Sequence, residues 1–314
     1  MKPEIGSLTL KRAHGILFQK ERYFSSREKL SVMELIRLLG ERYPQLYTRP
    51  SEDAEEAYLT AATTGERTGD DLSHFIGSGE DWLRTEQTPA GPVEMLFLKE
   101  RADFETFLRC IAYRCRPVEI LPSVGAQTFF NLRNWQKIHE HEKEYLAGGG
   151  ADWSEELRRF DADKAKSRDT LILLSQGPYS ALSWQNTPFK EAEWLRVSLD
   201  IRRFHECAHV VCRRRFPEQK LPLWDELTAD FTGLRMATGC YDGKLAAAFL
   251  GVTQEGYVEG GRLKHYLEKG EDADAAAKEL WQVIGQLAER SSVCADEETW
   301  DLLLDLTREP LLYR

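Results

Sequence analysis

The sequence predicts an α+β protein that is predominantly helical and contains a small β-sheet. Its 314 residues, 42% of them hydrophobic and 30% charged, have the composition of a globular protein with ample material for a core. Long stretches with apolar residues three or four positions apart predict helices. A few short apolar runs beside glycine or proline predict strands. The helical stretches are longer and more numerous, so we expect helices to dominate the fold.

The N-terminal part of the chain is expected to combine helix with loop. Residues 1 to about 50 are expected to be helical; within them, Ser31–Leu39 begins with a capping serine and is followed by Gly40, a residue that commonly ends a helix. Residues 51–92 are polar and rich in turn-forming residues, which favours loops, most clearly at 63–71.

The next part of the chain alternates short apolar runs with charged helical stretches. Val93–Leu98 follows a Gly-Pro pair and predicts a strand, because a turn signal precedes a compact apolar run. We expect three further elements in this part: a helix over Asp103–Cys115, a strand over Val118–Leu121 and a charged helix over Asn131–Ala147.

A linker is expected to divide the chain. Three glycines, Gly148–Gly150, end the charged helix, and the charged stretch from there to Lys166 is typical of a linker or long surface loop. We therefore expect a mixed helical and strand region of unknown role over residues 1–165, and a second region over residues 166–314. The second region starts with the apolar run Leu171–Gln176, which predicts a buried strand.

A long helix follows in the second region. Thr187-Pro188 is a typical helix start, a capping hydroxyl with proline at the first helical position, and Pro217 ends the helix. The spacing of three, four or seven residues predicts one inward stripe along it, made of Trp194, Ile201, His205, Ala208 and Cys212.

A second helix should run from about Leu223 to Met236, where Gly239 ends it. The remaining chain has a turn-like segment at Tyr257–Gly261. Four more helices are expected, at Lys244–Leu250, Leu263–Glu268, Ala273–Arg290 and Glu297–Thr307.

The long helix carries the sequence HExxH, with histidines at His205 and His209 and a glutamate at Glu206. Residues four apart lie on one face of a helix, so both imidazoles can reach a single ion. An ion with two neutral nitrogen ligands keeps its charge and makes a bound water acidic. Glu206 is placed to take a proton from that water.

The second helix supplies carboxylates at Glu226 and Asp230, again four apart and hence on one face. One can be the third ligand that catalytic zinc requires, while the other accepts the outward N–H of a ligand histidine and fixes its orientation. Asp225 is an alternative third ligand. It is rotated by about 100° from Glu226, so the two cannot share one orientation on a regular helix.

These two helices resemble the gluzincin metallopeptidases, the thermolysin-like branch of the zincins, in which HExxH is followed by ExxxD on a second helix. The resemblance implies that His205, His209 and Glu226 bind Zn²⁺, that Glu206 is the general base and that Asp230 supports the first histidine.

The resemblance covers residues 201–239, about one eighth of the chain, and no specific family is indicated by the rest. It implies a zincin-like catalytic half over residues 166–314, with an active-site helix and a small sheet. In such a fold, Leu171–Gln176 could be the edge strand that pairs with an extended peptide beside the metal.

Cleavage of an amide also needs a donor for the oxyanion that forms on the attacked carbonyl. The candidates are His265, Tyr257, Tyr266 and Tyr179, all near glycine-containing turns. His265 is the first choice, because it lies downstream of the two metal helices, where such donors often occur.

The overall charge excludes some classes of binding partner. A net charge of −10 argues against a general nucleic-acid or acidic-membrane partner, since both require a basic surface. No apolar segment resembles a signal peptide or a membrane span, and the six cysteines form no CxxC pair, so we expect a cytoplasmic protein with reduced thiols. The oligomeric state is left open.

The sequence therefore favours a zinc-dependent peptidase with a peptide or protein substrate. Two alternatives remain: a catalytically silent metal-binding protein that regulates or binds a partner, and a hydrolase of non-peptide amides.

Overall fold

The computed structural model describes residues 32–69, 71–295 and 298–312, and these form two compact units. The sheet unit comprises residues 32–87 and 92–176 of the described chain, and the helical unit comprises residues 88–91 and 177–312. The strand at Leu171–Gln176 belongs to the sheet unit, and not to the second region, in which the sequence places it.

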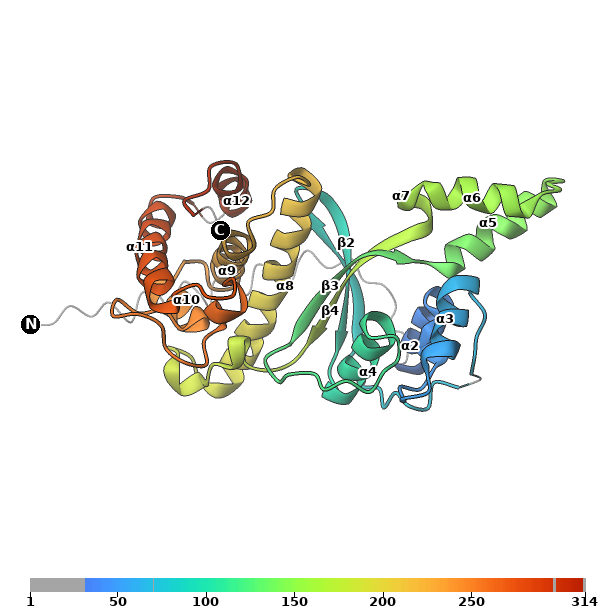
Figure 1. Cartoon of the computed structure of the whole chain (residues 1–314), viewed down its shortest axis with the longest axis horizontal. Coiled ribbons are helices and arrows are strands. Elements are labelled where there is room, and N and C mark those ends of the chain that lie inside the picture. The colour runs from blue at the N-terminus through green and yellow to red at the C-terminus, as the bar shows by residue number, and fades with distance from the viewer. Residues whose placement is uncertain (1–31, 70, 296–297, 313–314) are drawn as a thin grey trace, which may run out of the picture. The chain divides into compact units, whose positions relative to one another are not determined.

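The fold is α+β as expected, with 55% helix and one four-stranded mixed sheet among the described residues (Figure 1). The strands lie in the order β1-β2-β4-β3. Strand β2 pairs in parallel with β4, and β3 pairs with β4 antiparallel. Their bounds are β1 Trp82–Thr88, β2 Gly91–Leu98, β3 Ala126–Arg133 and β4 Arg168–Ser175.

The position of β4 corrects one expectation. Strand β4 contains the apolar run that we considered as a peptide-binding edge, but it lies between β2 and β3. Its residues Leu171–Leu174 are all buried, so both faces of the strand are covered. A strand covered on both faces reads as a continuous apolar run, and its backbone groups pair with strands on both sides. It cannot take up a further strand.

Helices α2 (Val32–Arg42) and α4 (Arg101–Ala112) form the core of the sheet unit with one face of β2 and β4. Gly40 does not end α2 as predicted. It lies within the helix, where an added Cβ would come 2.7 Å from Cε2 of Tyr47. This glycine permits a close contact with the 3₁₀ turn η2 (Pro44–Tyr47) and is not a stop signal.

Other differences in the sheet unit fall where polar sequence hides an ordered element. Helix α3 (Glu55–Thr64) and strand β1 lie in the region expected to be loop. Helices α6 (Trp153–Ala162) and α7 (Lys164–Ser167) replace the expected linker, because Asp152 and Asp163 accept hydrogen bonds from backbone N–H groups and cap them.

The strand expected at Val118–Leu121 is wrong, and the chain pairs instead as β3 from Ala126. Helix α5 (Trp135–Ala147) consequently starts four residues later than predicted. Asn134 fixes that start, since its side chain accepts a hydrogen bond from the N–H of Lys137.

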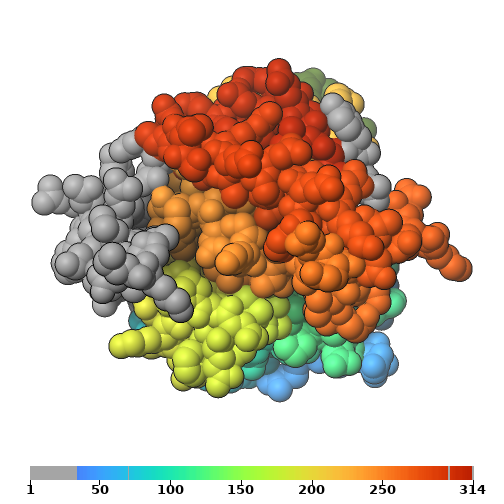
Figure 2. Space-filling view, turned by 90° about the vertical axis from the view of Figure 1, so that its left-hand side faces the viewer, coloured from blue at the N-terminus to red at the C-terminus, as the bar shows by residue number. Residues whose placement is uncertain are grey.

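The helical unit is built around the long helix α8, which packs along α9 (Figure 1). Figure 2 shows one face of this unit, with the C-terminal helices in red above orange segments and the start of α8 and the segment before it in yellow-green below. The helices are α8 Glu191–Arg215, α9 Pro222–Thr238, α10 Gly243–Leu250, α11 Ala273–Ser292 and α12 Thr299–Arg308, with 3₁₀ turns η3 Tyr179–Ala181, η4 Trp184–Asn186 and η5 Arg262–His265.

Most helices of this unit match their predictions. Gly239 ends α9 in the left-handed conformation with φ of 77°, which favours glycine. The start of α8 was predicted too early, because Thr187 lies before the helix and its hydroxyl bonds to the carbonyl of Trp184. The expected helix at Leu263–Glu268 is only the turn η5.

Helices α8 and α9 approach each other closely at Gly233. A Cβ at this position would lie 2.7 Å from the carbonyl oxygen of Ile201 and 3.4 Å from the Cβ of His205. A larger residue would therefore force the two helices apart beside a predicted metal ligand. None of the helices in the described chain is both long enough and apolar enough to span a bilayer.

Candidate metal centre

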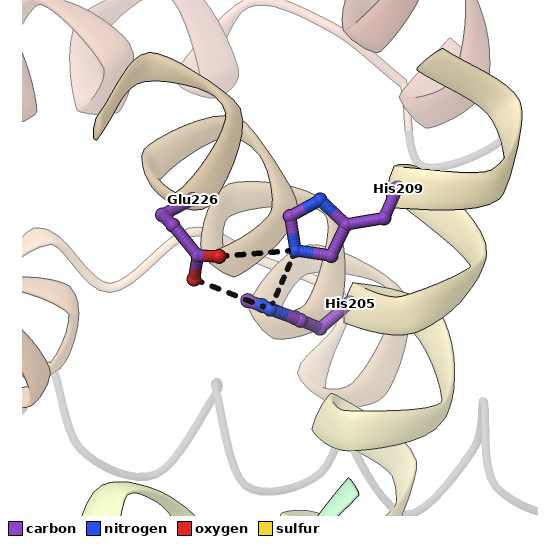
Figure 3. Close-up of side chains that lie close together, drawn as sticks. All are labelled: His205, His209 and Glu226. Carbon is purple, nitrogen blue, oxygen red and sulfur yellow. Dashed lines mark hydrogen bonds and ion pairs between the residues drawn. The ribbon is translucent and has the colours of Figure 1, made fainter. Parts of the chain in front are cut away.

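Three predicted ligands meet between α8 and α9. His205 and His209 project from one face of α8, and Glu226 projects from α9 toward them (Figure 3). Their Nε2 atoms lie 3.0 Å apart, and Glu226 Oε1 lies 3.4 Å from Nε2 of His209. Glu226 Oε2 lies 3.6 Å from Nε2 of His205. Among the described residues, this is the one cluster of three or more histidine, cysteine or carboxylate groups close enough to hold an ion.

These separations suit a zinc ion. Bonds of 2.0–2.1 Å at tetrahedral angles put neighbouring ligand atoms about 3.3 Å apart. The two imidazole nitrogens lie 3.0 Å apart, and each faces a different oxygen of Glu226, at 3.4 Å and 3.6 Å. With one ligand atom taken from each residue, all three atoms lie within 4.8 Å of one another. Two nitrogens and one carboxylate form a donor set typical of catalytic zinc, an ion that keeps its fourth position for water or substrate.

The charge state of the cluster also favours a cation. Burial opposes a charged imidazolium at His209, but the hydrogen bond and charge of Glu226 outweigh it and raise the pKa of His209 to about 9. Burial would raise the pKa of Glu226, yet its pKa is lowered by His209, His205 and Arg262. The ligands thus hold a proton at neutral pH where an ion would supply positive charge instead.

Asp230 lies behind His205, as the resemblance implies. Its Oδ1 is 3.0 Å from Nδ1 of His205, and the residue is completely buried. The hydroxyl of Tyr179 donates to the same oxygen at 2.5 Å and lies 2.9 Å from Nδ1 of His205. Since a carboxylate only accepts, Nδ1 must carry the proton, which leaves the lone pair of Nε2 facing Glu226 and His209.

Arg262 and Tyr266 complete the surroundings of the two carboxylates. Arg262, in η5, donates to Oδ2 of Asp230 and has Nη1 3.8 Å from Oε2 of Glu226. Its guanidinium lies over the ring of Tyr179, 5.3 Å from the centroid. The hydroxyl of Tyr266 donates to Oε2 of Glu226 at 3.0 Å. Sequence reasoning missed Arg262, because an arginine in a short irregular turn carries no periodic signal.

His265 is not brought to the cluster. Its side chain is exposed, and its ring contacts that of Tyr266 edge-on with centroids 6.5 Å apart. The role of His265 as oxyanion donor stays a prediction. Arg262 and Tyr266 of the same segment do reach the cluster, since they donate to Asp230 and Glu226. Tyr257 is also elsewhere, since its hydroxyl donates to the carbonyl of Gly261.

Glu206 and Asp225 lie at the margin of the cluster. Glu206 is partly buried on α8, and its negative charge contributes to the raised pKa of His209. Asp225 acts on His209 in the same way, while burial raises its own pKa. The structure brings Glu226, and not Asp225, into the group of ligand atoms.

The segment before α8 holds Tyr179 in place. Its N–H donates to the hydroxyl of Ser198 at 2.9 Å. The buried Arg202 donates to the carbonyls of Gly177 at 2.6 Å and Pro178 at 2.8 Å. Ser180 follows at φ of 51°, a left-handed conformation that is costly for a non-glycine residue. Such a conformation persists only where surrounding contacts enforce it.

Comparisons with known proteins assign a family and no activity. A family model described as a family of unknown function, DUF7005, matches residues 53–301, which include every residue of the metal cluster. No curated protein and no solved structure matches the chain.

Proposed function

We propose that this protein, which belongs to the DUF7005 family of unknown function, is a zinc-dependent peptidase with a zincin-like catalytic unit. The observation that carries the proposal is the convergence of His205, His209 and Glu226 at separations of 3.0–3.6 Å. Asp230 supports it from behind by holding His205 in the tautomer that a metal ligand needs.

A zinc ion in this cluster would polarise the carbonyl under attack and acidify the attacking water. The protein supplies the rest. Glu206, one residue after the first ligand, accepts the proton of the water and passes it to the leaving amine. Tyr266, whose hydroxyl donates to Oε2 of Glu226 in the structure, would turn this donor to the oxyanion of the substrate. Among the predicted donors, we prefer it to His265 for this contact with the cluster.

The substitution Glu206→Gln tests the catalytic part. It keeps size and polarity but removes the base, so we expect one zinc per chain to remain while peptide hydrolysis falls at least a hundredfold. Zinc content is measured by elemental analysis and hydrolysis against a proteome-derived peptide library. Cleavage by this variant at the wild-type rate would overturn the mechanism.

A matched variant tests the metal itself. His205→Ala should reduce the zinc content from about one per chain to none, whereas His265→Ala should leave it unchanged, because that side chain is exposed. Absence of zinc from the wild-type protein would overturn the proposal.

The two remaining functions are outcomes of the same assays. Retained metal with no hydrolysis of any peptide, and a partner affinity insensitive to Glu206→Gln, would select a silent metal-binding protein. Turnover of small amides but not of peptides would select the non-peptide hydrolase.

A further inference from the structure

We infer that Tyr179 is a positioning residue of the metal centre, acting on the ligand His205 through Asp230. The inference rests on the proposed metal site and extends it to a residue outside both metal helices. Tyr179 lies in η3, and its hydroxyl reaches both Oδ1 of Asp230 at 2.5 Å and Nδ1 of His205 at 2.9 Å.

The donors and acceptors around the Tyr179 hydroxyl determine which nitrogen of His205 carries the proton. Three atoms form a triangle: the Tyr179 oxygen, His205 Nδ1 and Asp230 Oδ1, with the third side 3.0 Å long. The carboxylate oxygen accepts from both other groups. If Nδ1 lacked its proton, its lone pair would face this carboxylate oxygen, an arrangement that is unfavourable in a buried site. The triangle therefore fixes both the tautomer of His205 and the plane of its ring.

Tyr179 also restrains Asp230. That side chain is fully buried and accepts from Tyr179 and His205 on one oxygen and from Arg262 on the other. Without the phenol, the carboxylate is free to rotate toward the guanidinium, which weakens its hold on the imidazole. Loss of such an outer partner typically lowers metal affinity 10–100-fold.

The way in which Tyr179 is held supports a positioning role. Its backbone is bonded to Ser198, and Arg202 bonds the two preceding carbonyls, so the residue is fixed to the same helix that bears the ligands. The left-handed backbone at Ser180 shows that the turn is constrained by its surroundings.

The test compares two hydroxyl deletions. Tyr179→Phe removes the contact but keeps the ring against Phe249, with centroids 4.7 Å apart. The control is Tyr241→Phe. Tyr241 is also buried in the helical unit, but its hydroxyl has no hydrogen-bond partner among the described residues. Zinc affinity is measured by competition with a chelating dye, and the Co²⁺-substituted proteins are compared by visible absorption at saturating Co²⁺.

We expect Tyr179→Phe to weaken zinc binding 10–100-fold and to alter the Co²⁺ bands, and Tyr241→Phe to change neither. The Co²⁺ spectrum at saturation reports ligand geometry and is not moved by a general loss of stability. Unchanged or tighter zinc binding in Tyr179→Phe, or equal weakening in both variants, would overturn the inference while the metal site stands. Failure of the wild-type protein to bind zinc would instead overturn the proposed function, and the inference with it.

Discussion

Each of the two units buries an aspartate that accepts hydrogen bonds from a tyrosine and a cation. A comparison of the two aspartates distinguishes a structural hydrogen-bond network from a candidate functional site. In the sheet unit, Asp169 on β4 accepts from Tyr43, Asn134 and Lys137, each at 2.7 Å. Every one of these contacts joins the carboxylate to a donor. We call this network closed, because Asp169 belongs to none of the histidine, cysteine and carboxylate clusters of the described chain that could hold an ion.

In the helical unit, Asp230 accepts from Tyr179, Arg262 and His205. The difference lies in the third donor. His205 links Asp230 to a second set of polar groups. Its Nε2 atom faces His209 and Glu226, and this group has more acceptors than protons. Both aspartates have hydrogen-bond donors for their oxygens, so a fully hydrogen-bonded buried aspartate does not by itself indicate a functional site. The candidate site is indicated by the group next to Asp230, where His205, His209 and Glu226 offer more acceptor atoms than protons.

The largest expected effect is a loss of stability when the hydrogen-bond network around Asp169 is broken. Asp169→Ala leaves the Tyr43 hydroxyl and the Asn134 amide buried without an acceptor, which should cost roughly 3 kcal/mol of unfolding free energy. Zinc content should stay at the wild-type level, because the residue belongs to the other unit. Urea denaturation and elemental analysis measure the two quantities; a loss of zinc comparable to that in His205→Ala would contradict a purely structural role.

A smaller effect tests the spacing that makes the open cluster possible. Gly233→Ala brings a methyl group against the Ile201 carbonyl and should destabilise the protein by about 1–3 kcal/mol. Because the displaced helix carries Glu226, zinc affinity should fall as well. The control is Gly285→Ala on α11, where a Cβ meets nothing within 4 Å, so the change should raise stability by about 0.5–1 kcal/mol. Equal effects of the two substitutions would refute the argument from helix spacing.

The smallest effect compares thiols from the two units. Burial, opposed by the hydrogen bond between Cys212 and Thr307, raises the pKa of Cys212 to about 11, so only about one molecule in a thousand is a thiolate at pH 8. In the sheet unit, the pKa of Cys110 is also raised, first by its contact with Cys115 and then by burial. Iodoacetamide at pH 8 should therefore label the exposed Cys240 and neither of the other two.

Removal of zinc should change this pattern in one unit only. Cys212 lies three residues after the proposed ligand His209. If the cluster holds zinc, loss of the ion should weaken the contact between α8 and α9, so chelation should speed the labelling of Cys212 several-fold. Cys110 should not respond. Mass spectrometry of the labelled peptides decides; a parallel rise at Cys110 would mean that the ion stabilises the whole chain and not one unit.

The sequence predicted the elements whose periodicity is local and strong. The spacing of His205, His209, Glu226 and Asp230 indicated one face on each of two helices, and the structure brings these residues together. The buried strand β4 was also predicted, although its interior position was not. Single-strand patterns describe burial and not neighbours, so the order of strands was out of reach.

Elements with little apolar content escaped prediction. Helix α6 has no buried residue in its ten, although Trp153, Leu157 and Phe160 recur at helical spacing, and β1 is exposed or half-buried throughout. The residues around the candidate metal centre were not predicted for another reason. Tyr179 and Arg262 lie in short 3₁₀ turns, 26 residues before and 32 residues after their partners His205 and Asp230. Only the tertiary fold brings such turns to the site.

The bonds from Arg202 to the chain before Tyr179 have a mechanical consequence. The polypeptide leaves the sheet unit at Gln176, and the next two carbonyls, of Gly177 and Pro178, are bonded to this one guanidinium. A force transmitted along the backbone through Gln176 is thus borne by α8 before it reaches the phenol. Arg202 therefore anchors the first residues of the helical unit to α8, the helix that carries His205 and His209.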